Sequence, residues 1–158
     1  MTQRDLSLTL RDHRALTGLD MLRAMRDGTL PGPPIAGPMR MALKEVEFGK
    51  SVFTCDPDET LYNPFGVVHG GAICTVLDSA TGCAAGSVLE AGLSYTSIDI
   101  DVSFLRPITI SMGTLFAVGT VTKPGKRVIF TEGSLTDSAG TLLATATSRL
   151  LVFPTPLS

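Results

Sequence analysis

The sequence contains no tryptophan, only two histidines and only three cysteines. The cysteines Cys55, Cys74 and Cys83 are odd in number, and their spacing matches neither a disulfide framework nor a zinc pattern. His13 and His69 lie far apart in the sequence, so no local cluster of histidine and cysteine ligands can form around a metal. These shortages argue against a disulfide-stabilised secreted domain, and we expect a reducing, cytoplasmic compartment.

Charge is also scarce and nearly balanced. The 158 residues include 13 Lys and Arg against 15 Asp and Glu, a net charge of −2, and 44% are hydrophobic. This composition is typical of one globular domain with a sizeable core. Without a global basic field we expect no nucleic-acid partner. Residues 1–14 carry charges of both signs and no apolar segment, so we expect no secretory signal there.

The stretch from Gly70 to Leu89 has a single formal charge, at Asp78. An Asp at the centre of a bilayer costs roughly 2.5–3.5 kcal/mol. The same stretch holds four glycines and two cysteines, which make it only weakly lipophilic. The sequence therefore predicts a helix buried inside the protein, not a membrane span, and no membrane partner.

Hydrophobic periodicity divides the chain into an N-terminal arm, residues 1–38, and a body, residues 39–158. The arm is predicted to hold a short amphipathic helix over about 16–27 and a proline-rich connector that can be neither helix nor central strand. In the body, the buried helix over about 70–89 separates two predicted strands from four, at about 39–48, 51–55, 94–104, 113–122, 127–136 and 142–153. This order predicts an α+β fold with an antiparallel sheet.

The two faces of the central helix differ in side-chain size. A 3.6-residue period places an apolar set on one face, where it suits packing on a sheet: Ile73, Val76, Leu77, Ala80, Ala84 and Val88. The other face is small and weakly polar: Gly71, Cys74, Thr75, Asp78, Thr81, Gly82 and Ala85. Small side chains allow close approach by another backbone, such as the same helix of a second subunit.

Asp78 falls in the middle of this small face. A buried carboxylate needs partners, which Thr75, Thr81 or backbone donors could supply. A buried carboxylate with a shifted pKa is equally typical of catalytic groups. The helix alone leaves both interpretations open.

The helix is preceded by His69 and starts with Gly70 and Gly71. Two glycines in the first turn leave backbone N–H groups uncovered at the positive end of the helix dipole, where an anion or a developing oxyanion can bind. The alternative is that the glycines only permit a tight turn. Gly71 and Asp78 are seven residues apart, or ~10 Å along one helix. Both groups must come within ~3 Å of one carbonyl, so catalysis by both requires at least a dimer with shared sites.

A wider pattern contains these residues: Asn63, five residues, His69-Gly70-Gly71, six residues, Asp78, then Ser97-Ile-Asp99 and Phe104-Leu-Arg-Pro107. Over roughly residues 39–153 it closely resembles the hotdog-fold acyl-CoA thioesterases. The nearest subgroup is the phenylacetic-acid-pathway (PaaI) type, which is similar to the 4-hydroxybenzoyl-CoA thioesterases. The arm resembles the leader of bacterial members. His13 has no counterpart and is expected on the surface.

The resemblance implies a hotdog fold, in which a sheet wraps around one long helix. It also implies a homodimer with a continuous sheet, and often a homotetramer built from two such dimers. The activity implied is hydrolysis of an acyl-CoA thioester without a metal, with coenzyme A as part of the substrate and no other cofactor. A hotdog protein that only binds acyl-CoA is the main alternative. A hotdog dehydratase is a third, but its different His/Asp motifs are absent.

The resemblance also assigns roles to residues. The Gly70 N–H would polarise the thioester carbonyl, and Asn63 and His69 would hold the loop and help to orient the carbonyl or water. Asp78 of the partner subunit would be the nucleophile or the general base, and Ser97 would hold that carboxylate or the attacking water. These assignments need no Ser-His-Asp triad, and the sequence has no G-x-S-x-G motif.

Coenzyme A carries several negative charges, so a local basic patch is expected. Lys123, Lys126 and Arg127 cluster at one predicted turn, and the resemblance places them near the CoA phosphates, with Gly71 as a further substrate-binding residue. The alternative for the basic cluster is a solvated hairpin tip. The sequence leaves the acyl group open between aryl, short-chain and medium-chain types.

Overall fold

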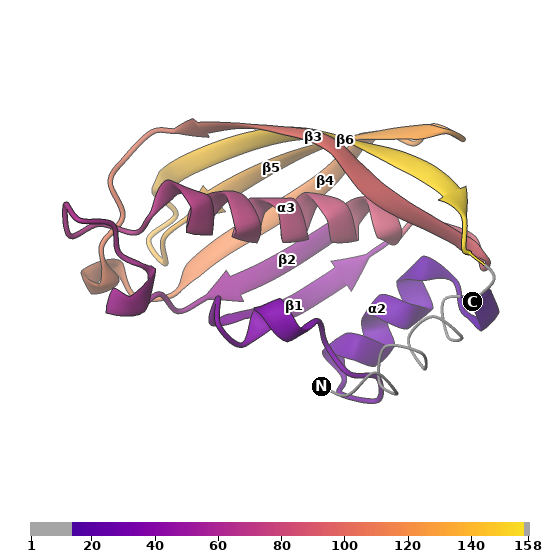
Figure 1. Ribbon diagram of the computed structural model, residues 1–158, viewed down its shortest axis with the longest axis horizontal. Helices are drawn as coiled ribbons and strands as arrows, with labels where there is room; N and C mark the ends of the chain where they lie inside the picture. The colour runs from indigo at the N-terminus through magenta and orange to yellow at the C-terminus, as the bar shows by residue number, and fades with distance from the viewer. Residues whose placement is uncertain (1–13, 157–158) are drawn as a thin grey trace.

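The structure is a computed structural model that describes residues 14–156. Residues 1–13, which include His13, and residues 157–158 lie outside the described residues. One curved sheet wraps around a long helix, α3 (Gly70–Gly86), and a shorter helix, α2 (Gly18–Arg26), lies at the edge of the molecule next to β1 (Figure 1). This is the α+β arrangement that the sequence predicts.

All pairings in the six-stranded sheet are antiparallel, in the order β1-β2-β4-β5-β6-β3. Strand β3 follows α3 in the chain and pairs with β6 at the opposite edge from β1. The strands are β1 (Met41–Glu47), β2 (Lys50–Cys55), β3 (Leu93–Phe104), β4 (Leu115–Lys123), β5 (Val128–Thr136) and β6 (Leu142–Pro154). Three short 3-10 turns complete the fold: η1 (Pro34–Ala36), η2 (Glu59–Leu61) and η3 (Ile110–Met112).

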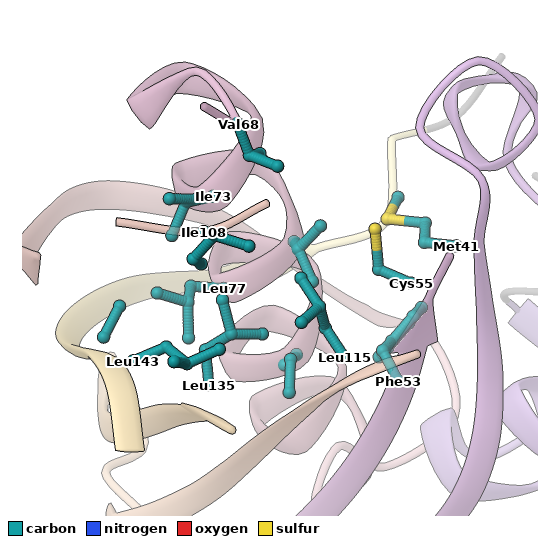
Figure 2. Packing of buried hydrophobic residues seen from close by; sticks show 14 of the residues in the cluster. Met41, Phe53, Cys55, Val68, Ile73, Leu77, Ile108, Leu115, Leu135 and Leu143 are labelled. Carbon is teal, nitrogen blue, oxygen red and sulfur yellow. The ribbon is translucent and has the colours of Figure 1, made fainter. Parts of the chain in front are cut away.

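The core lies between α3 and the concave face of the sheet (Figure 2). Leu77 points from the helix into this layer and is fully buried, as are Leu135 and Leu143 from the strands opposite it. Burying a leucine side chain is worth about 1.5–3 kcal/mol, so this row supplies much of the packing energy that holds the helix in place.

Two strand glycines let the helix lie very close to the sheet. A Cβ at Gly119 of β4 would overlap the carbonyl group of Ala80, and a Cβ at Gly133 of β5 would lie 2.9 Å from Cγ2 of Thr81. The Ser51 hydroxyl donates a hydrogen bond to the same Ala80 carbonyl oxygen at 2.7 Å. The middle of α3 is therefore fixed against β4 by close backbone approach, against β2 by the Ser51 hydrogen bond and against β5 by the Thr81 side chain.

The predicted elements are confirmed, with boundary shifts of a few residues. The predicted helix over 70–89 ends at Gly86, with Ser87 as its C-cap, and the arm helix starts at Gly18 because Thr17 caps it. The placement of Thr81 and Ala85 on the small face is wrong, since both are fully buried against the sheet. Thr81 can be buried because its hydroxyl donates to the carbonyl oxygens of Leu77 and Asp78 within the helix.

The described part of the arm packs on the body. The Gly18 N–H donates to the carbonyl oxygen of Leu89 at 2.9 Å, and a Cβ at Gly18 would overlap the Gly86 carbonyl group. Met21 and Leu22 of α2 are buried. The first turn of α2 thus sits directly on the last turn of α3. None of the helices within residues 14–156 is long and apolar enough to cross a membrane.

The close approach at Gly119 gives the first testable prediction. Gly119→Ala forces either the helix or the strand to move and should lower the free energy of unfolding by about 1–3 kcal/mol or more. Gly32→Ala is the control, since a Cβ there meets nothing within 4 Å, and its effect should stay within about 0.5 kcal/mol. Urea denaturation measures both. Equal stability of the two variants would contradict the backbone contact.

Candidate active site

The loop before α3 is held in one conformation by Asn63. Its side-chain Oδ1 accepts the N–H groups of Phe65 at 2.9 Å and Val67 at 3.4 Å, and its own N–H donates to the Val67 carbonyl oxygen at 2.8 Å. The loop then joins the body through the Val68 N–H, which donates to Ile108. Asn63 therefore fixes the path of the chain into the helix.

His69 is the N-cap of α3 and uses its side chain for the cap. Its Nδ1 accepts the Gly71 N–H at 2.9 Å, and its backbone carbonyl oxygen accepts those of Ala72 at 2.9 Å and Ile73 at 3.3 Å. Among the described residues, the N–H of Gly70 has no acceptor. One donor is thus left unpaired at the positive end of a helix of 17 residues.

Asp78 lies two turns further along the helix, beside the edge strand β3. Its Oδ1 accepts a hydrogen bond from the Ser97 hydroxyl of β3 at 2.8 Å. Thr75 and Thr81 are not its partners, because their hydroxyls donate to backbone carbonyl oxygens within the helix. The carboxylate is half-buried and is held from β3, so its second oxygen stays available to a substrate or water.

The predicted site residues therefore form two groups within one protomer. Asn63, His69 and Gly70 come together at the start of α3, and Asp78 and Ser97 come together at its middle. Gly70 and Asp78 are eight residues apart, which is about 12 Å along the helix axis. No single carbonyl can contact both in one protomer.

The basic turn lies at the far end of α3 from Gly70. A Cβ at Gly49 would sit 3.8 Å from Val121 of β4 and 3.9 Å from Val88, which follows the last turn of the helix. Lys123 ends β4 beyond that point, with its Nζ 5.8 Å from the centroid of the Phe130 ring. Within one protomer, the structure does not bring Lys123, Lys126 and Arg127 to the start of the helix.

A different basic residue does lie there. A groove of about 260 Å³ runs past the unpaired N–H, and its lining includes Val67, Gly70, Phe104 and Arg106. The Phe104 ring covers the helix start, since a Cβ at Gly70 would lie 3.2 Å from its Cζ. Arg106 is not among the residues predicted from the sequence to bind coenzyme A, although it is one of the basic residues in the C-terminal third of the chain. In the sequence, Pro107 indicates a turn directly after Arg106. This turn brings Ile108 next to the loop before α3, where its carbonyl oxygen accepts the Val68 N–H, and so places Arg106 near the helix start.

The three cysteines are unsuited to act as nucleophiles at neutral pH. Burial raises the pKa of the Cys83 thiol to about 12 and that of Cys55 to about 11, and it also raises the pKa of Cys74. Each thiol is therefore protonated. Within residues 14–156, no three His, Cys, Asp or Glu side chains come together as a set of metal ligands.

Comparison with known proteins shows the family to which this chain belongs. A family model described as the Thioesterase superfamily matches residues 65–144, which contain Gly70, Asp78 and Ser97. The chain belongs to the thioesterase superfamily. It is also 37% identical over 78 residues to a Halobacterium salinarum protein provisionally named an esterase. That match covers 48% of this chain and 50% of the relative, so the chain spans about half the length of this curated relative.

Solved structures show the same fold. The phenylacetic acid degradation-related protein of Ralstonia eutropha JMP134 is 29% identical with a TM-score of 0.76, and the match covers 82% of this chain and 98% of that one. The Escherichia coli PaaI protein has a TM-score of 0.76 at 19% identity, covering 87% and 96%. The resemblance to the PaaI-type hotdog thioesterases is thereby confirmed, and the roles of individual residues stay predictions.

The cap at His69 gives the second prediction. His69→Ala leaves the Gly71 N–H without an acceptor and should lower the free energy of unfolding by about 1 kcal/mol. His69→Asn restores a side-chain acceptor at the N-cap and should recover most of this loss. Chemical denaturation compares the two variants. If His69→Ala is as stable as the wild type, the cap does not stabilise the helix.

Proposed function

We propose that the protein hydrolyses acyl-CoA thioesters to a free acid and coenzyme A, in the cytoplasm. The observation that carries the proposal is that α3 has both an N-terminal N–H without an acceptor among the described residues, at Gly70, and a half-buried carboxylate, Asp78, held by Ser97. A thioester is already activated, so the enzyme needs only an oxyanion donor and a base or nucleophile. The superfamily membership supports this chemistry.

In the proposed reaction, the thioester carbonyl oxygen accepts the Gly70 N–H at the positive end of the helix. Asp78 of the partner subunit removes a proton from water, whose oxygen then bonds to the carbonyl carbon. The negative charge that forms on the carbonyl oxygen is stabilised by the N–H and the helix dipole. The C–S bond then breaks, and the sulfur of coenzyme A leaves with its electron pair and takes up a proton. Direct attack by the carboxylate on the carbonyl would use the same two groups.

A shared site explains why the two groups lie about 12 Å apart in one protomer. If two α3 helices pack antiparallel through their uncovered faces, Gly70 of one protomer meets the partner's Asp78. Gly71 and Thr75 are small enough for that approach. Strand β3 bonds to β6 along one edge, and its other edge is open to pairing with the partner's β3 in a continuous sheet. We further propose that two such dimers form a homotetramer.

The same arrangement assigns the CoA phosphates to basic residues of both protomers. Arg106 lies in the groove next to Gly70. Because the helices are antiparallel, the far end of the partner's α3 extends past Gly70. The partner's Lys123, Lys126 and Arg127 therefore lie on the side where coenzyme A leaves the site. Arginine and lysine at the surface can bind phosphate without a deep pocket.

Removing the base is the direct test of the activity. Asp78→Asn keeps the size of the side chain but cannot take up the proton, so thiol release from an acyl-CoA panel should fall ~10²-fold or more. Asp101→Asn changes an exposed carboxylate of β3 and should retain wild-type rates. If the wild type binds CoA esters but hydrolyses none, the protein is an acyl-CoA-binding protein. If Asp78→Asn retains full activity, Asp78 is not the base.

Mixing two inactive variants tests the shared site. Gly70→Pro removes the N–H without breaking the helix, because proline fits the first position of a helix and His69 already has the extended conformation that proline requires before it. A dimer of one Asp78→Asn chain and one Gly70→Pro chain has one intact site. Random pairing of equal amounts should therefore restore about a quarter of the wild-type activity per chain.

Gly70→Ala is the control for this experiment, since it adds the same Cβ against Phe104 but keeps the N–H. It should stay active on its own. A mixture of the two inactive variants that shows no activity would mean that each site lies within one chain.

A further inference from the structure

An apolar cavity of about 500 Å³ lies between the arm and the body. Helix α2 and the proline-rich connector form one wall, and β1 with the C-terminal half of α3 forms the other. Its lining includes Met21, Met25, Pro33, Met41, Phe53 and Tyr95. This volume is within the usual range of small-molecule sites, about 300–1,000 Å³.

The chemistry of the lining selects an uncharged, apolar ligand. Among the described lining residues, Arg26 is the only charged one, and its guanidinium donates to the carboxylate of Asp27 at 2.8 and 3.2 Å. Burial raises the pKa of Tyr95 well above its usual value, so its hydroxyl stays neutral. The cavity thus offers no free cation to a carboxylate or phosphate, and large apolar surfaces to a hydrocarbon.

The cavity begins close to the Asp78 carboxylate of the same protomer. Cys83, which lines it, is five residues after Asp78, or about 7.5 Å along the helix. Tyr95 is two residues before Ser97 on β3, or about 7 Å away, and Ser97 holds Asp78. The Tyr95 ring lies on α3, because a Cβ at Gly82 would be 3.2 Å from it and one at Gly86 2.8 Å. Carboxylate and cavity therefore follow one another along one helix.

We infer that this cavity receives the acyl group of the thioester, which must be an apolar alkyl or aryl group. The inference rests on the proposed function. The protomer that supplies Asp78 also binds the acyl group. Coenzyme A lies in the groove by Phe104 of the protomer that supplies Gly70, where the basic turn of the partner reaches its phosphates. The arm forms the roof of the acyl site, so α2 and the connector determine which acyl groups fit.

Binding of S-alkyl-CoA thioethers tests this without turnover, since these compounds cannot be hydrolysed. Isothermal titration would compare free coenzyme A with its butyl, octyl and benzyl thioethers. In the wild type, affinity should rise about fourfold for each buried methylene group. Comparing the affinities of the octyl and benzyl thioethers shows whether the site prefers a linear or an aromatic acyl group.

Two variants remove the site in different ways. Ala36→Phe fills the cavity from the connector, and Gly18→Val pushes the arm off the end of α3. Both should reduce the ratio of octyl-CoA to CoA affinity at least tenfold. Gly37→Ala is the control and should keep the wild-type ratio, because a Cβ there lies 3.9 Å from its nearest neighbour and Gly37 does not line the cavity.

A wild type with no preference for alkylated coenzyme A would overturn the inference, and so would a preference that survives both variants. Either result leaves the thiol-release assay to decide the proposed function separately. Conversely, a lost preference in both variants together with normal thiol release from a short acyl-CoA would support the acyl site and the thioesterase activity at once.

Discussion

The position of α3 against the sheet is the constraint on which the rest of the structure depends. Gly119 and Gly133 bring the helix into contact with the strand backbones, and Ser51 adds a hydrogen bond to the Ala80 carbonyl oxygen. Once the middle of the helix is fixed in this way, its start and its uncovered side are fixed as well. The Gly70 N–H and the Asp78 carboxylate therefore occupy defined places in the molecule, although neither is part of the core.

Because the helix is rigid, one protomer cannot bring the Gly70 N–H and the Asp78 carboxylate to the same thioester carbonyl, whereas a site shared between two protomers can. An oxyanion donor at the first position and a carboxylate two turns later cannot converge on one atom. Two antiparallel copies can bring them together, because each helix presents its donor where the other presents its acceptor. Hydrogen bonds made by His69 and Ser97 leave these two groups available for the shared site. His69 accepts the Gly71 N–H, the Gly70 N–H has no acceptor among residues 14–156, and Ser97 orients one oxygen of Asp78.

The ends of the substrate differ in chemistry, and the surfaces near the site differ in the same way. The side near Gly70 is a shallow groove with Arg106, which suits an anionic, solvated carrier. The side beyond Asp78 is a larger apolar cavity under the arm, and Arg26, the one arginine in its described lining, is paired with Asp27. This division gives the arm a chemical function that its proline-rich sequence does not reveal, since prolines in a connector indicate only where regular structure is absent.

The sequence by itself determined the order of the helices and strands, the buried nature of the central helix and the separation of Gly70 from Asp78. These are local properties that depend on periodicity, turn residues and helix rise. It failed for Thr81 and Ala85, because a helical wheel cannot show how far a curved sheet wraps around the helix. Only the tertiary structure decided that Ser97 donates to the Asp78 carboxylate of its own chain, that Arg106 lies beside Gly70, and that the arm covers an apolar cavity. These contacts join residues distant in the chain, and their distances are set by packing, not by local sequence.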